Sequence, residues 1–196
     1  MWVGYPKEQE KPFKQTNARR GLTMQSRDNQ KLSSLLSLLK ELPKNIISLH
    51  STENLTEFVL HQLCNERHFD LNRAAYFVDN PHFDHLKGIA GFSKHEAYAG
   101  GLDHWAFPDQ FSRHMEQSRF NRQVRQIMRP GITTRYTQEA MQDLADSCAF
   151  AHPQYLLWQL KHENHGLLLF EQPSDEKFVQ EHLADAVRFL GFCPVF

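Results

Sequence analysis

The fold is decided by the stretch YLLWQLKHENHGLLLFE, residues 155–171, near the end of the chain. Two apolar runs of strand length, Tyr155–Leu160 and Leu167–Glu171, flank the polar segment Lys161–Gly166. Two such runs joined by a short polar connection that ends in glycine are typical of a β-hairpin. The sequence therefore predicts two neighbouring antiparallel strands here.

A second pair of strands is predicted earlier in the chain. Asn72–Val78 (NRAAYFV) reads as a strand that ends at Asp79-Asn80-Pro81, and Leu86–Phe92 follows it with two glycines that weaken a strand. Apolar residues at helical spacing predict helices around these strands. The helical segments are Asn29–Leu42, ended by Pro43; Asn54–Glu66, with a capping box of Asn54 and Glu57; Asp109–Met128; Thr137–Ala145; and Pro173–Leu190.

This order of elements predicts an α+β fold. Because the strands come in neighbouring pairs, we expect a single antiparallel sheet of about four to six strands with helices packed on it. The length of 196 residues fits one domain, residues 28–196. Residues 1–27 lack periodicity and are expected to form a flexible arm, and Met24 is an alternative start that would leave residues 1–23 outside the native protein.

The same element order is similar to that of GAF-like and profilin-like sensor domains. The resemblance rests on the order of elements and on no motif. It implies a ligand cavity between the sheet and the central segment 93–128.

Composition narrows the class of partner. The chain has 22 Lys and Arg against 23 Asp and Glu, a net charge of −1, so binding to nucleic acid is not expected. No apolar run approaches the roughly 20 residues that span a bilayer, and the residues up to Met24 lack the apolar core of a secretory signal. Three widely spaced cysteines form no CxxC pair. These features predict a cytoplasmic protein without a membrane segment.

Sequence motifs favour a non-enzymatic module. The chain contains no P-loop, no GxGxxG, no GxSxG and no HExxH motif. Fifteen Phe and three Trp supply apolar bulk for a core, and an aromatic cluster near Gly100-Gly101 is typical of a binding pocket. The leading hypothesis is a sensory or regulatory module that binds a small ligand between the sheet and segment 93–128. The residues expected to line that site are His82, His85, Tyr98, His104 and Trp105.

Twelve histidines support a second hypothesis, a metal-dependent enzyme. His82, Asp84 and His85 follow a predicted strand and offer nitrogen and oxygen ligands for a transition metal, with His104 as a further ligand or base. The alternative interpretation is a polar turn in which Asp79 and Asn80 bind local backbone donors.

A third hypothesis is an interaction module. Along one side of a predicted helix lie Arg119, Arg122, Arg125 and Arg129, which suit phosphate, a nucleic acid or an acidic protein partner, although a solvated helix shows the same pattern. The N-terminal arm is another contact for a partner protein, and a homodimer is compatible with either surface.

Overall fold

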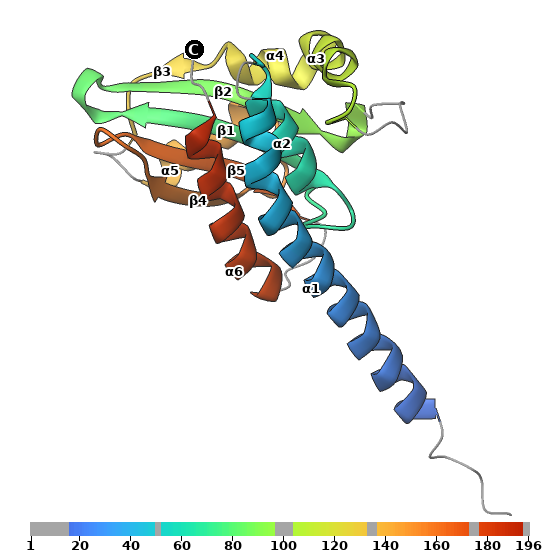
Figure 1. Ribbon diagram of the computed structural model, residues 1–196. Helices are drawn as coiled ribbons and strands as arrows, with labels where there is room; N and C mark the ends of the chain where they lie inside the picture. Colours follow the sequence, from blue (N-terminus) through green and yellow to red (C-terminus); the bar gives the residue numbers. More distant parts are fainter. Residues whose placement is uncertain (1–15, 50–51, 97–103, 133–136, 173–176, 194–196) are drawn as a thin grey trace, which may run out of the picture.

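A computed structural model describes residues 16–49, 52–96, 104–132, 137–172 and 177–193. Within these ranges the chain forms one antiparallel sheet of order β3-β2-β1-β5-β4 with α-helices packed on it (Figure 1). The predicted α+β class and the predicted single sheet are confirmed. The strands are β1 Arg73–Asn80, β2 His85–Ser93, β3 Met128–Arg129, β4 Gln154–Gln159 and β5 His165–Glu171. The helices are α1 Thr16–Ser48, α2 Leu55–Cys64, α3 Pro108–Gln117, α4 Arg119–Arg125, α5 Gln138–Ser147 and α6 Lys177–Ala186.

Both predicted hairpins form. Strand β2 pairs with β1, and β4 pairs with β5, in each case antiparallel. Strand β1 also pairs with β5, so that it lies in the middle of the sheet. The register between β1 and β2 shifts after Tyr76, where Ala90 is its partner but Gly88 is the partner of Phe77. Ile89 is the extra residue of this β-bulge, which changes the face to which the following residues of β2 point.

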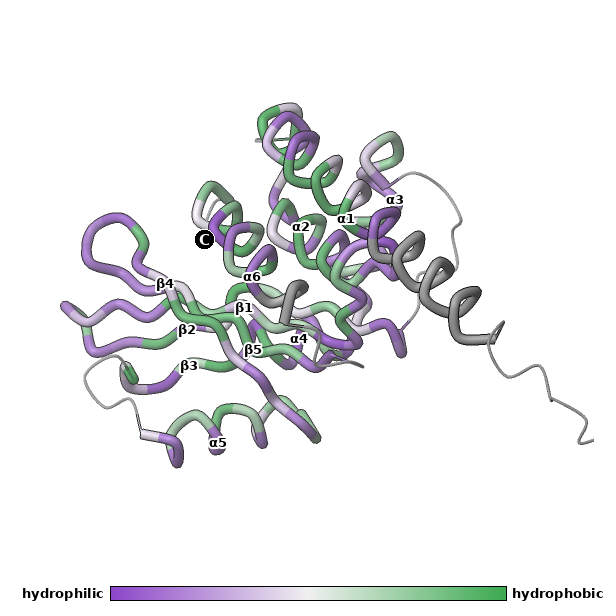
Figure 2. The backbone as a smooth tube through the Cα atoms, turned by 90° about the horizontal axis from the view of Figure 1, so that it is seen from below, coloured by the Kyte–Doolittle hydropathy of each residue, from purple (hydrophilic) through white to green (hydrophobic). Residues whose placement is uncertain are grey.

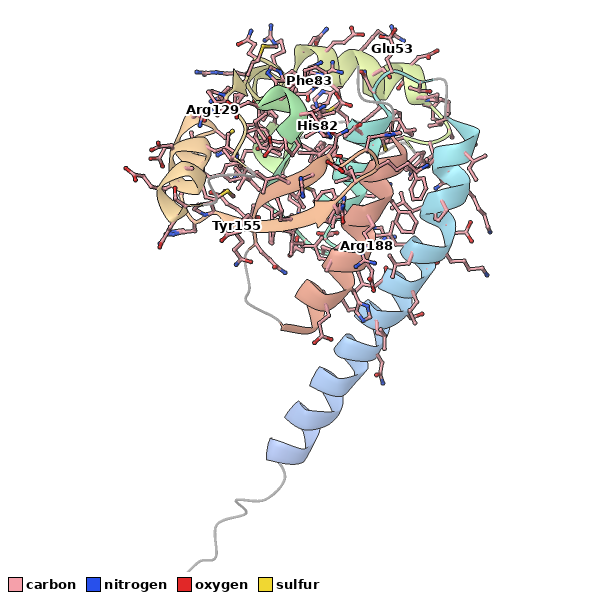
Figure 3. All side chains as sticks on the ribbon, turned by 90° about the vertical axis from the view of Figure 1, so that its left-hand side faces the viewer. Glu53, His82, Phe83, Arg129, Tyr155 and Arg188 are labelled. Carbon is pink, nitrogen blue, oxygen red and sulfur yellow. The ribbon has the colours of Figure 1, made fainter. Side chains whose placement is uncertain are left out.

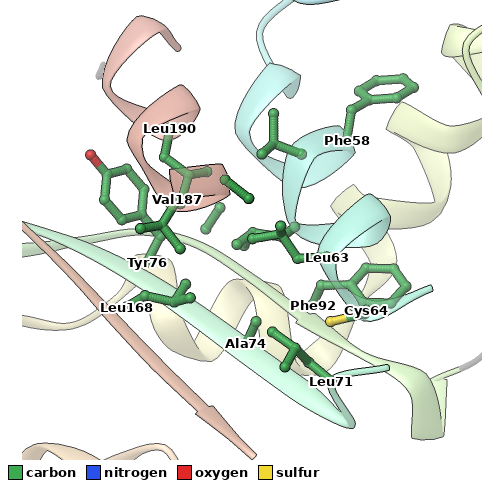
Figure 4. Close-up of a cluster of buried hydrophobic side chains, with 14 of the residues drawn as sticks. Phe58, Leu63, Cys64, Leu71, Ala74, Tyr76, Phe92, Leu168, Val187 and Leu190 are labelled. Atoms are coloured by element: carbon green, nitrogen blue, oxygen red, sulfur yellow. The ribbon is translucent and has the colours of Figure 1, made fainter. Parts of the chain in front are cut away.

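Two apolar layers cover the two faces of the sheet. Helices α1, α2 and α6 lie side by side over one face, and α5 lies behind the other (Figure 1). Alternation along β1 divides its side chains between them: Ala74 and Tyr76 join the first layer, while Ala75 and Phe77 join the second. Figure 4 shows part of the first layer, where α2 and the C-terminal segment meet the sheet. Hydrophilic residues gather in the turns at the ends of the hairpins (Figure 2).

Helix α1 is longer than the sequence pattern predicts. It runs from Thr16 to Ser48 with Pro43 inside it, so the predicted start at Asn29 and the predicted end before Pro43 are wrong. The stripe that packs on the sheet side is Leu35, Leu38, Leu42 and Ile46, all buried. Positions 16–27 of the expected arm belong to this helix, and residues 1–15 lie outside the described residues.

The predicted helix Asp109–Met128 is divided into two. Ser118 ends α3 and is also the N-cap of α4, where its Oγ accepts a hydrogen bond from Asn121 N at 3.0 Å. Met128 was expected on the apolar face of that helix but lies in the short strand β3 and is exposed. Thr137 caps α5 as predicted, by accepting a hydrogen bond from Ala140 N.

Helix α4 closes one edge of the sheet. Strand β3 pairs with Leu86 and Lys87, and in the part of the chain that the structure describes the rest of β2 has no strand neighbour on that side. There Gly88 N donates to Ile127 O, just after α4, at 2.9 Å. Gly91 N donates to Asn121 Oδ1 at 2.9 Å, and Arg125 Nε donates to Ile89 O at 3.1 Å. These groups take the place of a neighbouring strand.

The glycines of β2 make this approach possible. A Cβ at Gly88 would lie 1.9 Å from Val124 O, and one at Gly91 would lie 2.7 Å from Val124 Cγ2. The two glycines weakened the prediction of a strand, yet the strand forms because the glycines let the helix lie against its backbone.

At the C-terminal end of α5, Arg73 links its own strand β1 to the helices α4 and α5. Its guanidinium carbon lies 4.2 Å from the centre of the Phe120 ring and 5.0 Å from that of Phe150. It donates to Cys148 O at 2.9 Å and to Ala149 O at 2.5 Å, the carbonyls at the end of α5. A cation suits both the aromatic faces and a helix C-terminus, so Arg73 ties β1 to α4 and α5.

Candidate functional site

The polar residues that follow β1 hold a turn and a loop. Asn80 Oδ1 accepts hydrogen bonds from His82 N at 3.1 Å and from Phe83 N at 3.3 Å. Asp79 Oδ2 accepts from Ile132 N, and Asp84 Oδ1 accepts from Gly131 N, each at 3.1 Å. The alternative interpretation, that these side chains bind backbone donors, is confirmed for Asn80; Asp79 instead binds a donor far along the chain.

The predicted metal ligands are not brought together. His82 is exposed in the turn and lies 3.0 Å from Glu163 Oε2 of the β4–β5 turn, while His85 begins β2 and is partly buried (Figure 3). Asp84 holds the loop at Gly131. Among the residues that the structure describes, no three His, Cys, Asp or Glu side chains gather closely enough to hold a metal ion. The geometry therefore does not support the predicted triad.

His104 and Trp105 lie in a different part of the molecule, beside α2 and α3. His104 Nε2 lies 2.8 Å from His61 Nε2, and their rings meet edge to face with centroids 4.0 Å apart. The ring of His104 also stacks on Phe111, and Trp105 lies against Phe58. One of the two ring nitrogens donates a hydrogen bond and the other accepts it.

The charge state of His61 follows from its surroundings. Burial lowers its pKa to about 3, and the neighbouring His104 adds to that shift. His61 is therefore neutral over the physiological range. Phe92 at the end of β2 and Phe111 of α3 lie edge-on to the His61 ring, so the pair is part of an aromatic core.

Of the five residues predicted to line one ligand site, the four that the structure describes lie in two separate places. His85 begins β2, whereas the histidine pair lies beside Phe92 near its end. Seven residues of strand at about 3.3 Å each separate these positions by roughly 23 Å. Tyr98 lies outside the described residues. His104 and Trp105 are together, and His82 and His85 are a separate group.

The carboxylate of Glu57, which the sequence pattern predicted to be part of a capping box, is buried between α2 and α4. Asn54 makes no cap hydrogen bond through its side chain, and Glu57 points into the protein instead, so the predicted capping box is wrong. Glu57 Oε1 accepts from Asn121 Nδ2 at 3.1 Å and lies 3.6 Å from Arg125 Nε. Its Oε2 is buried without a hydrogen-bond partner.

Asn121 is the centre of this network. Its Oδ1 accepts from Gly91 N, and its Nδ2 donates to Glu57 Oε1 and to Met115 O. Glu96 extends the network, because its two carboxylate oxygens accept from Ser118 Oγ at 2.5 Å and from Phe120 N at 3.0 Å at the start of α4. The sequence gives one signal for Glu57: a carboxylate at a position of α2 whose neighbours Leu55, Phe58 and Leu60 are apolar.

Glu57 makes stability depend on pH. Burial raises its pKa above the ordinary value of 4.5, although Arg125 and Asn121 oppose the shift. The folded protein therefore keeps this proton to higher pH than the unfolded chain does, and stability falls as the pH rises from about 4.5 toward the folded pKa. Glu57→Gln removes this titration. We expect the free energy of unfolding of the variant, relative to the unmodified protein, to rise through that pH window in urea unfolding experiments.

Glu41→Gln is the control for this experiment, because Glu41 is exposed and lies only beside Lys44. A difference between Glu57→Gln and the unmodified protein that stays constant with pH would contradict the role given to the carboxyl group.

The arginine face is divided between two residues that bind neighbouring parts of the protein and two that line a surface hollow. Arg125 turns toward Ile89 and Glu57, and Arg129 Nη2 donates to Ser147 Oγ at 3.4 Å. Arg119 and Arg122 are exposed and line a shallow hollow of about 340 Å³ together with Gln123 and Gln126. Two of the four predicted partner-binding arginines therefore have structural roles.

All three cysteines are buried and free. Burial raises the pKa of each thiol, to about 11 for Cys148 and about 12 for Cys193, and raises that of Cys64 as well. The thiolate is the reactive form, so these side chains are packed as apolar groups.

Comparisons with family models, with curated proteins and with solved structures find no match to this chain. None of the helices in the described residues combines the length and the apolar character needed to cross a bilayer.

Proposed function

We propose that the chain is a non-enzymatic regulatory module that associates with a helical partner through α1. The observation that carries this proposal is a second apolar stripe on α1, of which the body covers Leu39 in part and leaves Leu36 and Ile47 exposed. The proposal keeps the protein partner and the cytoplasmic location that the sequence predicts.

Helix α1 extends well beyond the body (Figure 1). Its 33 residues span about 50 Å at 1.5 Å per residue. Among the residues of α1 whose side chains the structure describes, 29–48, Leu35 is the first that is buried in the core. In proteins most of the stability of a helix comes from the packing of an apolar face, which favours a partner along the projecting part.

The second stripe lies beside the buried one. Leu32, Leu36, Leu39, Pro43 and Ile47 follow one another at intervals of four, three, four and four residues, which places them on one side of the helix. Leu36 is 53% exposed and Ile47 is 71% exposed. A partner helix that lays an apolar face along this stripe would bury both side chains, in the way that an amphipathic helix occupies a groove.

The packing of α4 on the sheet gives less support to the hypothesis that a small ligand binds between the sheet and segment 93–128. Val124 of α4 lies against the backbone of Gly88 and Gly91, and Phe120 is buried beside them. The cysteines and the histidine pair are enclosed in the core, which favours regulation by association over catalysis.

The proposal predicts that charge on the second stripe abolishes association. Leu36→Lys combined with Ile47→Lys should leave the fold intact and weaken binding to a purified helical partner by at least about tenfold, because two ammonium groups would enter an apolar seam. Ser37→Lys combined with Ser48→Lys is the matched control, since both serines are exposed neighbours on another side of the helix.

The measurement has two stages. First, proteins that bind to the full chain but not to the variant with Leu36→Lys and Ile47→Lys, the stripe variant, are identified. The purified candidate partner is then titrated by calorimetry against the unmodified chain, the stripe variant and the serine control. Equal affinity for the stripe variant and the serine control would refute the proposal.

A further inference from the structure

Four polar side chains on the outer side of α4 and its C-cap line one surface hollow. The side chains that surround this volume of about 340 Å³ are Arg119, Arg122, Gln123 and Gln126. Their spacing of three, one and three residues places them together on one side of the helix. Helix α4 lies along the β2 edge of the sheet (Figure 1), and its other side is buried there through Phe120 and Val124. The hollow is therefore built on a helix face that the fold holds in place.

The lining of the hollow carries two positive charges and no negative one. None of its four residues is acidic, and Arg119 and Arg122 are neighbours on consecutive turns of α4. Like charges placed in this way destabilise a helix. Glu96 lies at the same end of the helix, but its carboxylate accepts hydrogen bonds from Ser118 Oγ and Phe120 N and does not line the hollow. An anion bound between the two guanidinium groups would relieve their repulsion.

The guanidinium groups of Arg119 and Arg122 have hydrogen-bond donors available for a ligand. Within the described residues, Arg119 shows no hydrogen bond or ion pair, and Arg122 Nη2 has Gln117 O as its acceptor at the long distance of 3.4 Å. Arg125 of the same helix, in contrast, lies 3.6 Å from Glu57 Oε1. Each guanidinium carries five N–H donors in a planar fork. Two such forks that line one hollow make a site for an anion with several oxygen atoms.

Charge and shape favour a phosphate group as this anion. A carboxylate has one negative charge and two oxygens, which a single guanidinium can bind in bidentate fashion. A phosphorylated side chain carries a charge of about −1.5 to −2 and three acceptor oxygens, which match two guanidinium groups. Gln126 lies one turn beyond Arg122 and is exposed, so its amide can donate to the same group. The hollow therefore suits a phosphate monoester better than a carboxylate.

The shape of the hollow favours a phosphate carried by a protein segment. Sites for small molecules are mostly apolar and bury most of the ligand, whereas this hollow is shallow and lined by polar side chains. It holds a phosphate group and leaves the rest of the ligand to lie over α4, as a peptide segment does. A nucleic acid or an anionic membrane needs a wider basic surface. The net charge is −1, and Arg125 and Arg129 bind other parts of the protein.

We propose that this hollow binds a phosphoserine of a partner protein. The short side chain of phosphoserine suits a shallow hollow, because it keeps the peptide backbone close to α4. Recognition of phosphorylated segments by clusters of arginine is a recurring mode of regulated association. The site uses none of the residues of the second stripe on α1, so the inference goes beyond the proposed partner of that helix. A partner that binds here does so only after its phosphorylation.

The first test measures affinity. A library of peptides with a central phosphoserine and randomised flanks is passed over the immobilised full chain, and the Kd of the retained peptide is measured by fluorescence anisotropy. Arg119→Gln combined with Arg122→Gln should raise this Kd by at least about tenfold, because both charge-assisted contacts are lost. Arg67→Gln combined with Arg188→Gln is the matched control, since it removes the same charge from exposed arginines on other elements. Circular dichroism and thermal melting check that both variants fold.

The second test identifies the chemical group and its place of binding. The same peptide without phosphate, the peptide with glutamate in place of phosphoserine, inorganic phosphate, and vesicles containing phosphatidic acid are each titrated against the chain. All four should bind at least about tenfold more weakly than the phosphopeptide. In NMR spectra the Nε–Hε signals of Arg119 and Arg122 should shift with the phosphopeptide. The signal of Arg73, which lies against two aromatic rings and the end of α5, should stay in place.

The outcomes separate this inference from the proposed function. A library that leaves no peptide on the chain, or a Kd that is equal for the arginine variant and its control, overturns the phosphoserine site. Inorganic phosphate, the glutamate peptide or vesicles that bind as tightly as the phosphopeptide overturn it too, and assign the hollow to that ligand. The stripe variant of α1 should bind the phosphopeptide as tightly as the unmodified chain does, so each proposal can fail without the other.

Discussion

Gly88→Ala is expected to destabilise the protein by roughly 3 kcal/mol, the upper end of the range for overpacking. The added Cβ would lie 1.9 Å from Val124 O and 2.8 Å from Val124 C, and these are backbone atoms that no change of rotamer can move. Alanine restricts the unfolded chain more than glycine does, but that gain is about 0.5–1 kcal/mol, smaller than the cost of displacing α4. Urea unfolding followed by circular dichroism measures the difference.

Gly191→Ala is the control for Gly88→Ala. A Cβ at Gly191 would lie 2.9 Å from Leu160 Cδ2, the far end of a flexible side chain that can move away. We expect this variant to lie within about 1 kcal/mol of the unmodified protein. Similar stabilities for the two variants would mean that α4 does not lie against the edge of β2 as described.

Asn121→Ala is expected to cost about 3 kcal/mol, because it removes one side chain that satisfies several buried groups. Gly91 N loses its acceptor, and Glu57 Oε1 and Met115 O lose a donor. Each buried polar group left without a partner costs about 1–3 kcal/mol, although relaxation and entering water reduce the sum. The free energy of unfolding at neutral pH is the quantity to compare.

Gln126→Ala tests whether the loss is specific to the network. Gln126 lies at the end of the same helix and is exposed, so its removal should change the free energy of unfolding by no more than about 0.5 kcal/mol. Equal losses for both substitutions would place the effect in helix propensity and not in the contacts of Asn121.

The elements that were predicted correctly are those whose sequence pattern lies within a short stretch of the chain. The hairpin at residues 155–171 follows from two apolar runs and a turn ending in glycine, and Thr137 marks the start of α5 through a cap that bonds three residues on. The predicted ends of α1 were wrong, and the reason is again local. Proline usually ends a helix, but packing of Leu42 and Ile46 on either side of Pro43 outweighs the missing hydrogen bond.

The contacts of the candidate site join residues that are far apart in the chain, so sequence patterns predict little about them. Asn54 and Glu57 have the spacing of a capping box, but only the approach of α4 reveals why the carboxylate turns inward. His61 and His104 are 43 residues apart, and no spacing rule connects them. His82, Asp84 and His85 are close in sequence, yet turn geometry directs them to different partners.

The position of β1 between β2 and β5 has a consequence for how the chain is made. Tyr76 pairs with Leu168, more than 90 residues later, and the same central strand supplies side chains to both apolar layers. Because the ribosome releases the chain from its N-terminus, β1 and β2 emerge long before β5 can cover them. Contacts so distant in sequence also slow folding. During synthesis the edge of β1 that pairs with β5 therefore stays without its neighbouring strand until the last quarter of the chain emerges, and an unpaired strand edge exposes a nascent protein to aggregation.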